Sequence, residues 1–173
     1  WFRKAIVMYK FAGLDQRQAR TLAAISRLQH DQGNYVEAEN SLLEAITIGI
    51  NPAPNELPAD ASAVLELLSL SDGGEEVEGE AARIRADMLG RLGYLCLKQA
   101  KYVDAEEFYQ LSQAMYTSLG DGTSEARELR HLGRLYGIQE RHEEATEHFA
   151  QARVASAGIG DYDGEVKALD GLM

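Results

Sequence analysis

One stretch of the chain is nearly repeated forty residues further along. Each copy contains a leucine next to a glycine, then a ring side chain, an alanine and a second ring side chain. The matching positions are Leu92-Gly93, Tyr102, Ala105 and Tyr109 in one copy and Leu132-Gly133, His142, Ala145 and Phe149 in the next. Repetition at a fixed period of this length is typical of stacked helical units, because one unit cannot bury its apolar face alone. The chain is therefore expected to fold as an all-α array of antiparallel helix pairs.

The spacing of apolar residues supports this expectation along most of the chain. Apolar side chains recur at i, i+3, i+4 and i+7, which is the period of an amphipathic helix, and no stretch alternates convincingly as a strand does. The ranges predicted to be helical are 1–12, 15–32, 35–50, 59–71, 75–99, 102–119, 123–138, 142–158 and 162–173. Gly120 and Gly160 stand where the end of a helix favours the left-handed conformation.

The repeats also predict how the chain is organised. A looser copy, Ile25-Ser26, Tyr35, Ala38 and Leu42, precedes the two close ones. We expect one array over residues 1–173, with repeats at about 15–50, 76–119 and 123–158 and partial repeats at 1–12 and 162–173. Ala38 and Ala105 are 67 residues apart rather than forty, so an insertion is expected at about 51–75. It is either a capping or partner-contacting element or a tolerated loop.

Composition narrows the classes of function. The chain has 17 Lys and Arg against 28 Asp and Glu, a formal net charge of -11, which opposes binding to nucleic acid or to an anionic membrane. No apolar run is long enough for a membrane span, and the first residues lack the layout of a signal peptide or an initiator Met. We therefore expect a fragment of a longer protein. Cys96 is the single cysteine and suits a reducing compartment, so a cytoplasmic location is expected.

Motifs that would indicate catalysis or metal binding are incomplete. His142-Glu143 begins like a helical zinc-protease motif, but Thr146 stands where the second histidine ligand belongs. Asp161-Tyr162-Asp163-Gly164 lacks the ligand spacing of a calcium loop, and no nucleophile elbow is found. We expect no catalytic residues, no metal site and no cofactor.

The repeated residues resemble the tetratricopeptide repeat family. Its pattern, W-x2-L-G-x2-Y followed by A-x3-F, is met by Leu132-Gly133-Arg134-Leu135-Tyr136 with Ala145 and Phe149. The resemblance implies a right-handed superhelical solenoid. Small residues such as glycine are expected to let the two helices of a pair approach closely, and aromatic residues are expected to fill the gaps between pairs. The forty-residue period is similar to the long variant of kinesin light chains, cell-polarity adaptors and the arrays of NLR-like signalling ATPases.

The resemblance also implies a concave groove lined by the first helix of each pair. The groove residues predicted to bind a peptide are Arg20, Arg27, Tyr94, Lys98, Arg127, Arg130 and Arg134, with Lys167 at the matching place in the last, incomplete copy. Arg127, Arg130 and Arg134 are spaced by three and four residues, so they share one helix face. Ala23 and Gly90 are small and are expected to leave room for a partner side chain. The alternative is that these arginines pair with Glu128, Glu125 or Asp87 and only solvate the helix.

Three hypotheses for function follow from these features. The first is a non-catalytic protein–protein interaction scaffold whose groove binds a peptide or helix of an acidic partner, because arginine offers paired donors to carboxylates. The second is a sensor or autoinhibitory module of a larger NLR-like signalling ATPase. The third is an architectural array that self-associates through exposed terminal repeats.

Overall fold

A computed structural model describes residues 15–50 and 79–172, and every regular element in these two ranges is an α-helix. The helices are α2 (Asp15–Asp31), α3 (Tyr35–Ile50), α5 (Gly79–Lys98), α6 (Tyr102–Ser118), α7 (Gly122–Ile138), α8 (His142–Gly158) and α9 (Tyr162–Leu172). The all-α prediction is confirmed, and each predicted helix end inside the described ranges agrees to within one residue. The predicted helices 1–12 and 59–71 and the insertion at 51–75 lie outside these ranges. None of the described helices is long and apolar enough to cross a membrane.

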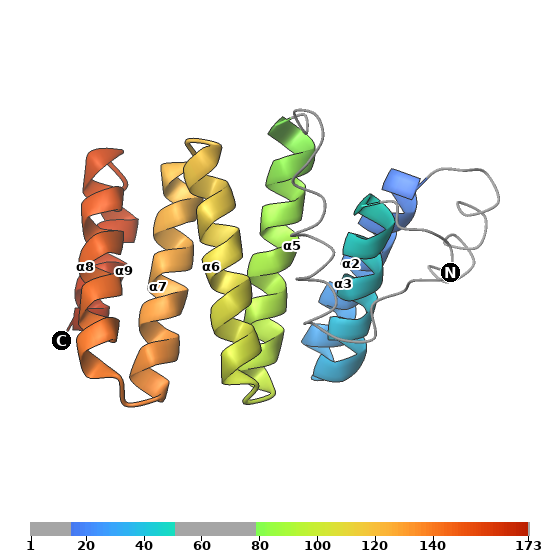
Figure 1. Ribbon diagram of the computed structural model, residues 1–173, viewed down its shortest axis with the longest axis horizontal. Coiled ribbons are helices and arrows are strands. Elements are labelled where there is room, and N and C mark those ends of the chain that lie inside the picture. Colours follow the sequence, from blue (N-terminus) through green and yellow to red (C-terminus); the bar gives the residue numbers. More distant parts are fainter. Residues whose placement is uncertain (1–14, 51–78, 173) are drawn as a thin grey trace. The chain divides into compact units, whose positions relative to one another are not determined.

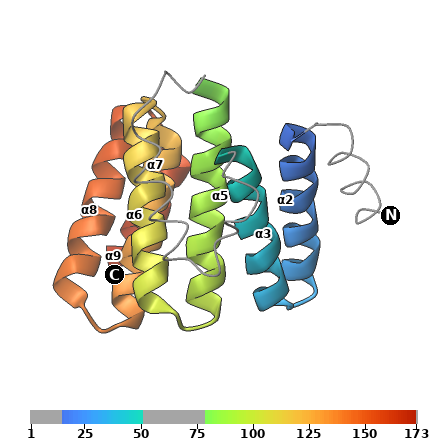
Figure 2. The ribbon, with the colours of Figure 1, turned by 45° about the vertical axis from the view of Figure 1, so that its right-hand side comes forward.

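The chain divides into two compact units, Trp1–Glu76 and Val77–Met173. In the first, α2 and α3 form a helical hairpin whose two helices lie side by side in both views (Figures 1 and 2). Leu22 and Leu42 are buried in it, and the Ser26 hydroxyl donates a hydrogen bond to the Ala38 carbonyl at 2.7 Å. The hairpin is thus held by an apolar core and by a direct link between its two helices.

The second unit stacks two helix pairs, α5–α6 and α7–α8, followed by α9 (Figure 1). Helix α6 packs on α7 and α8 packs on α9, so each pair contacts the next. The first helices of successive pairs also touch, α5 with α7 and α7 with α9. This succession makes α7 the centre of a continuous face built from first helices.

Glycine positions in the first helices receive aromatic rings from the second helices. A Cβ atom at Gly93 would lie 2.8 Å from Cδ1 of Tyr109, and one at Gly133 would lie 3.0 Å from Cδ2 of Phe149. Both distances are shorter than ordinary van der Waals contact. The rings can therefore pack here only because glycine has no side chain. The prediction that glycines let the two helices of a pair approach closely is confirmed at these two places. In the first hairpin, Ser26 takes the place of the glycine and is larger than it. Leu42 takes the place of the aromatic residue and is smaller than it.

Each described turn between helices contains a residue in the left-handed backbone conformation, with a positive φ. Gly33, Gly120 and Gly160 have φ values of 78°, 66° and 71°, as expected for the residue after a helix C-terminus. Ala100 and Glu140 adopt the same conformation, with φ of 59° and 60°, although each carries a Cβ atom. The turn inside each helix pair of the second unit therefore keeps its shape without glycine, at a cost in backbone strain.

Candidate binding site

Three arginines of α7 meet in one cavity of the second unit. The cavity has a volume of about 440 Å³ and opens between α7 and α9, with one ring contributed by α8. Its lining residues are Arg127, Arg130, His131 and Arg134 from α7, Phe149 from α8, and Lys167, Asp170 and Gly171 from α9. Four of the eight lining residues therefore carry a positive charge and one carries a negative charge, in a chain whose overall charge is strongly negative.

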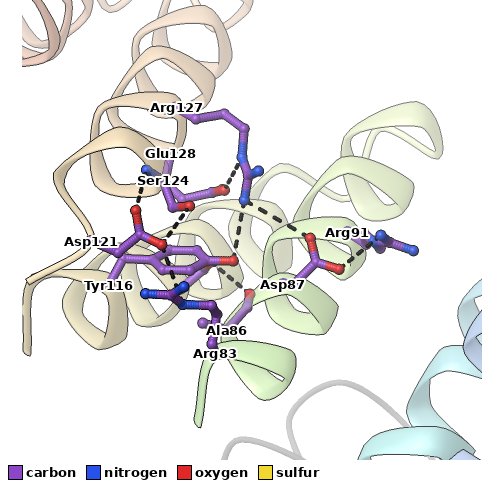
Figure 3. Close-up of polar contacts among 10 residues, drawn as sticks. Arg83, Ala86, Asp87, Arg91, Tyr116, Asp121, Ser124, Arg127 and Glu128 are labelled. Atoms are coloured by element: carbon purple, nitrogen blue, oxygen red, sulfur yellow. Dashed lines mark hydrogen bonds and ion pairs between the residues drawn. The ribbon is translucent and has the colours of Figure 1, made fainter. Parts of the chain in front are cut away.

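Arg127 is held by its neighbours on three helices. Its Nε donates to Oε1 of Glu128 at 2.9 Å, and its Nη2 donates to the Tyr116 hydroxyl at 3.2 Å. Asp87 of α5 lies 4.0 Å from the same Nη2 atom. Figure 3 shows the guanidinium of Arg127 among these three groups. The alternative that the arginines pair internally is therefore correct for Arg127.

Glu128 is a buried carboxylate, with its side chain 1% exposed. Burial raises the pKa of Glu128, and the Arg127 guanidinium opposes this rise. Oε1 accepts from Arg127, whereas Oε2 has no hydrogen-bond partner among the described residues. An ionised carboxylate with a half-satisfied end is expensive to bury, so its presence calls for an explanation other than stability.

Gly90 of α5 makes room for this carboxylate. A Cβ atom at Gly90 would lie 2.9 Å from Oε2 of Glu128. The expectation that Gly90 leaves space for a partner side chain is therefore wrong, because Gly90 is buried and Glu128 fills the space beside it. The space could not be assigned from sequence, since the side chain that occupies it lies in the next repeat.

Arg130 and Arg134 differ from Arg127 in their lack of partners. Neither makes an ion pair or hydrogen bond with any residue that the structure describes, and Nη1 of Arg130 is buried without a partner. Burial lowers the pKa of Arg130, and the charges of Arg127 and Arg134 act in the same direction. Two guanidiniums one helical turn apart are thus left with unused donors, although Asp161 partly offsets the lowering of the pKa of Arg130.

His131 lies against the aromatic core beside the arginines. Its ring stacks on Tyr109, with centroids 5.2 Å apart and an angle of 13° between the planes. Burial, together with the positive charges of the three arginines of α7, lowers the pKa of His131 to about 4. At neutral pH His131 is therefore uncharged and adds nothing to the positive charge of the cavity.

The other predicted groove residues lie elsewhere. On α5, the Lys98 ammonium sits 5.2 Å from the centre of the Tyr94 ring, and neither residue lines the cavity. Arg20 and Arg27 are exposed on α2, which belongs to the first compact unit. Lys167 of α9 does line the cavity, and it forms an ion pair with Asp163.

Sequence reasoning named Glu128 only as a possible partner of the arginines, not as a buried part of this site, and it missed His131. Glu128 carries a usable signal, because it falls four residues before Leu132 on the apolar stripe of α7, where a charge is unusual. His131 carries no such signal, since a histidine beside the core is an ordinary structural feature.

Residues 84–153 match the sequence model of a family described as the tetratricopeptide repeat. This part of the chain is similar to tetratricopeptide repeats. The match extends from within α5 to within α8 and includes the three arginines and Phe149, whereas the α9 side of the cavity lies beyond it. No curated protein matched the chain. Tetratricopeptide repeats generally mediate protein–protein interactions, and the long-repeat subgroup stays a prediction.

Proposed function

We propose that the chain is a non-catalytic protein-interaction module that binds an acidic segment of a partner protein on the face formed by α7 and α9. The observation that supports this proposal is the cavity in which Arg130 and Arg134 present donors without partners. Tetratricopeptide repeats as a family bind proteins, and a cavity between two first helices suits an extended or helical segment. A carboxylate placed there would accept hydrogen bonds from both guanidiniums.

The net charge of the chain and the local charge of the cavity act on an acidic partner over different distances. The net charge of -11 repels an acidic partner at long distance. At physiological salt this repulsion is screened over roughly 8 Å, whereas partly buried charges in contact are screened much less. The short-range attraction of the arginines therefore dominates once the partner has docked. Selection of the partner depends on its fit to the cavity rather than on long-range steering.

A fluorescently labelled oligoglutamate peptide tests the proposal by fluorescence anisotropy. The double variant Arg130→Glu/Arg134→Glu should lose binding, because both unpaired donors are replaced by negative charge. The matched control is Arg153→Glu, which makes the same kind of charge change at an exposed position of α8 outside the cavity lining. Circular dichroism of each variant checks that the helices remain folded.

Unchanged binding in the double variant would show that the cavity is not the site. The contribution of the other predicted groove residues to binding is then tested with the variants Arg20→Glu/Arg27→Glu and Tyr94→Ala/Lys98→Glu. Affinity capture with the parent protein, followed by mass spectrometry, identifies the natural partner. A captured partner whose binding is insensitive to both the double variant and added oligoglutamate would contradict the proposed site.

A further inference from the structure

Repeat alignment places Glu128 at a position that the fold fills with apolar residues. Forty residues earlier the matching residue is Met88, and forty residues later it is Ala168. Both are buried, with exposed fractions of 7% and 0%. The stacking of helices therefore does not require a carboxylate at this position. Glu128 must be explained by what it contacts.

Two contacts define its surroundings. One carboxylate oxygen accepts from Nε of Arg127 at 2.9 Å, and the other faces Gly90 without a hydrogen-bond partner. Arg127 lines the cavity but turns its guanidinium toward Glu128, Tyr116 and Asp87 (Figure 3). Of the three cavity arginines, Arg127 is thus the one whose donors are already engaged.

Neighbouring carboxylates also offset part of the positive charge of the cavity. Glu128 offsets the charge of Arg127, and Asp163 offsets that of Lys167. The positive charges of Arg130 and Arg134 then remain, and Asp170 is the acidic residue among those that line the cavity. The carboxylate of Glu128 therefore reduces both the number of free guanidiniums and the positive charge that a ligand meets.

We infer that Glu128 is a positioning residue that restrains Arg127 and so limits the cavity to two available guanidiniums. The inference rests on the proposed function and names the residue that sets the strength and selectivity of that site. With the restraint in place, a partner needs acidic groups that match Arg130 and Arg134. Without it, Arg127 turns into the cavity and the site accepts more highly charged segments.

Two substitutions remove the restraint in different ways. Glu128→Gln keeps the shape and abolishes the charge, and Glu128→Met installs the residue found at the matching position of the preceding repeat. Both should bind labelled oligoglutamate more tightly than the wild type, by about fivefold, because a third guanidinium becomes available. Weaker or unchanged binding in both variants would overturn the inference.

A double-mutant cycle separates release of Arg127 from a simple change in charge. In an Arg127→Gln background there is no guanidinium to release, so Glu128→Gln should lose most of its gain in affinity. If the whole gain persists without Arg127, Glu128 acts only through its charge and the inference is wrong. Glu125→Gln, on the same helix and hydrogen-bonded to Thr117 instead, is the matched control and should show no coupling to Arg127.

A second measurement does not depend on any ligand. In nitrogen-15 NMR spectra the Nε–H group of Arg127 should exchange with water more slowly than that of exposed Arg153, and Glu128→Gln should remove the difference. Equal exchange in the wild type would overturn the inference even if oligoglutamate binds. If oligoglutamate fails to bind the wild type while Arg127 is protected, the proposed function fails and the restraint stands.

Discussion

The Nε atom of Arg127 donates a hydrogen bond at 2.9 Å to the carboxylate of Glu128, the next residue along the same helix. Adjacent residues on a helix do not face each other. The Arg127 side chain nevertheless reaches this carboxylate, which is 1% exposed. This contact explains why one of three arginines on the cavity is engaged and the other two are not.

The burial of Glu128 makes stability depend on pH. Its pKa is raised in the folded state, so the folded chain binds the proton more tightly than the unfolded chain does. The free energy of unfolding contributed by this group is therefore largest at low pH and falls as pH rises through the folded pKa. Urea denaturation from pH 4.5 upward should show the wild type losing stability relative to Glu128→Gln. Parallel profiles for the two proteins would contradict this prediction, and Glu125→Gln controls for loss of a carboxylate on α7.

His131 should make the free energy of unfolding depend on pH in the opposite sense to Glu128. Its pKa falls from 6.5 to about 4 on folding, so the unfolded state binds the proton more tightly. The contribution of His131 to stability is complete above pH 6.5 and is lost as pH falls toward 4, by up to about 3 kcal/mol. His131→Phe keeps a ring against Tyr109 and should flatten this part of the profile. The matched control is the same substitution at exposed His142, on another helix.

Two glycines on neighbouring first helices should respond oppositely to alanine. At Gly93 a Cβ atom would lie 2.8 Å from the Tyr109 ring, so Gly93→Ala should lower the free energy of unfolding by about 1–3 kcal/mol. At Gly137 nothing lies within 4 Å of the added atom, so Gly137→Ala should raise stability by about 0.5–1 kcal/mol through helix propensity. Chemical denaturation of both variants checks the sign, and a stabilising Gly93→Ala would refute the packing argument.

The turn residues Ala100 and Glu140 offer a gain in stability. Both hold φ near +60°, which strains a residue that has a Cβ atom. Ala100→Gly and Glu140→Gly should each raise the free energy of unfolding by about 0.5 kcal/mol, after the greater freedom of glycine in the unfolded chain is counted. Thermal denaturation measures the change. Gly160→Ala, with φ of 71° in the wild type, is the reverse substitution and should lower the melting temperature.

The helices could be predicted closely because their signals are local. Apolar spacing and the glycines at Gly33, Gly120 and Gly160 are visible in short windows of sequence, and the repeat supplies independent copies of each. The close approach of the paired helices at Gly93 and Gly133 was also predictable, because both glycines recur at the same place in the repeat.

The state of each arginine could not be predicted in the same way. Arg127, Arg130 and Arg134 have the same chemistry and share one face, yet only Arg127 finds a partner in Glu128. That difference depends on Gly90, which lies on another helix and admits the carboxylate. Spacing within α7 carries no information about the neighbouring helix. The internally paired alternative is correct for Arg127, and the peptide-binding groove stays a prediction.

Asp87 and Arg127 occupy the same structural position in successive repeats, forty residues apart, and they lie 4.0 Å from each other across the boundary. The repeats are therefore not interchangeable modules. Duplicating the α7–α8 pair in place of α5–α6 would set an arginine against an arginine at this boundary. The order of these two units is set by the opposite charges of Asp87 and Arg127 at their boundary, and an engineer who extends or shuffles this array must keep that pair.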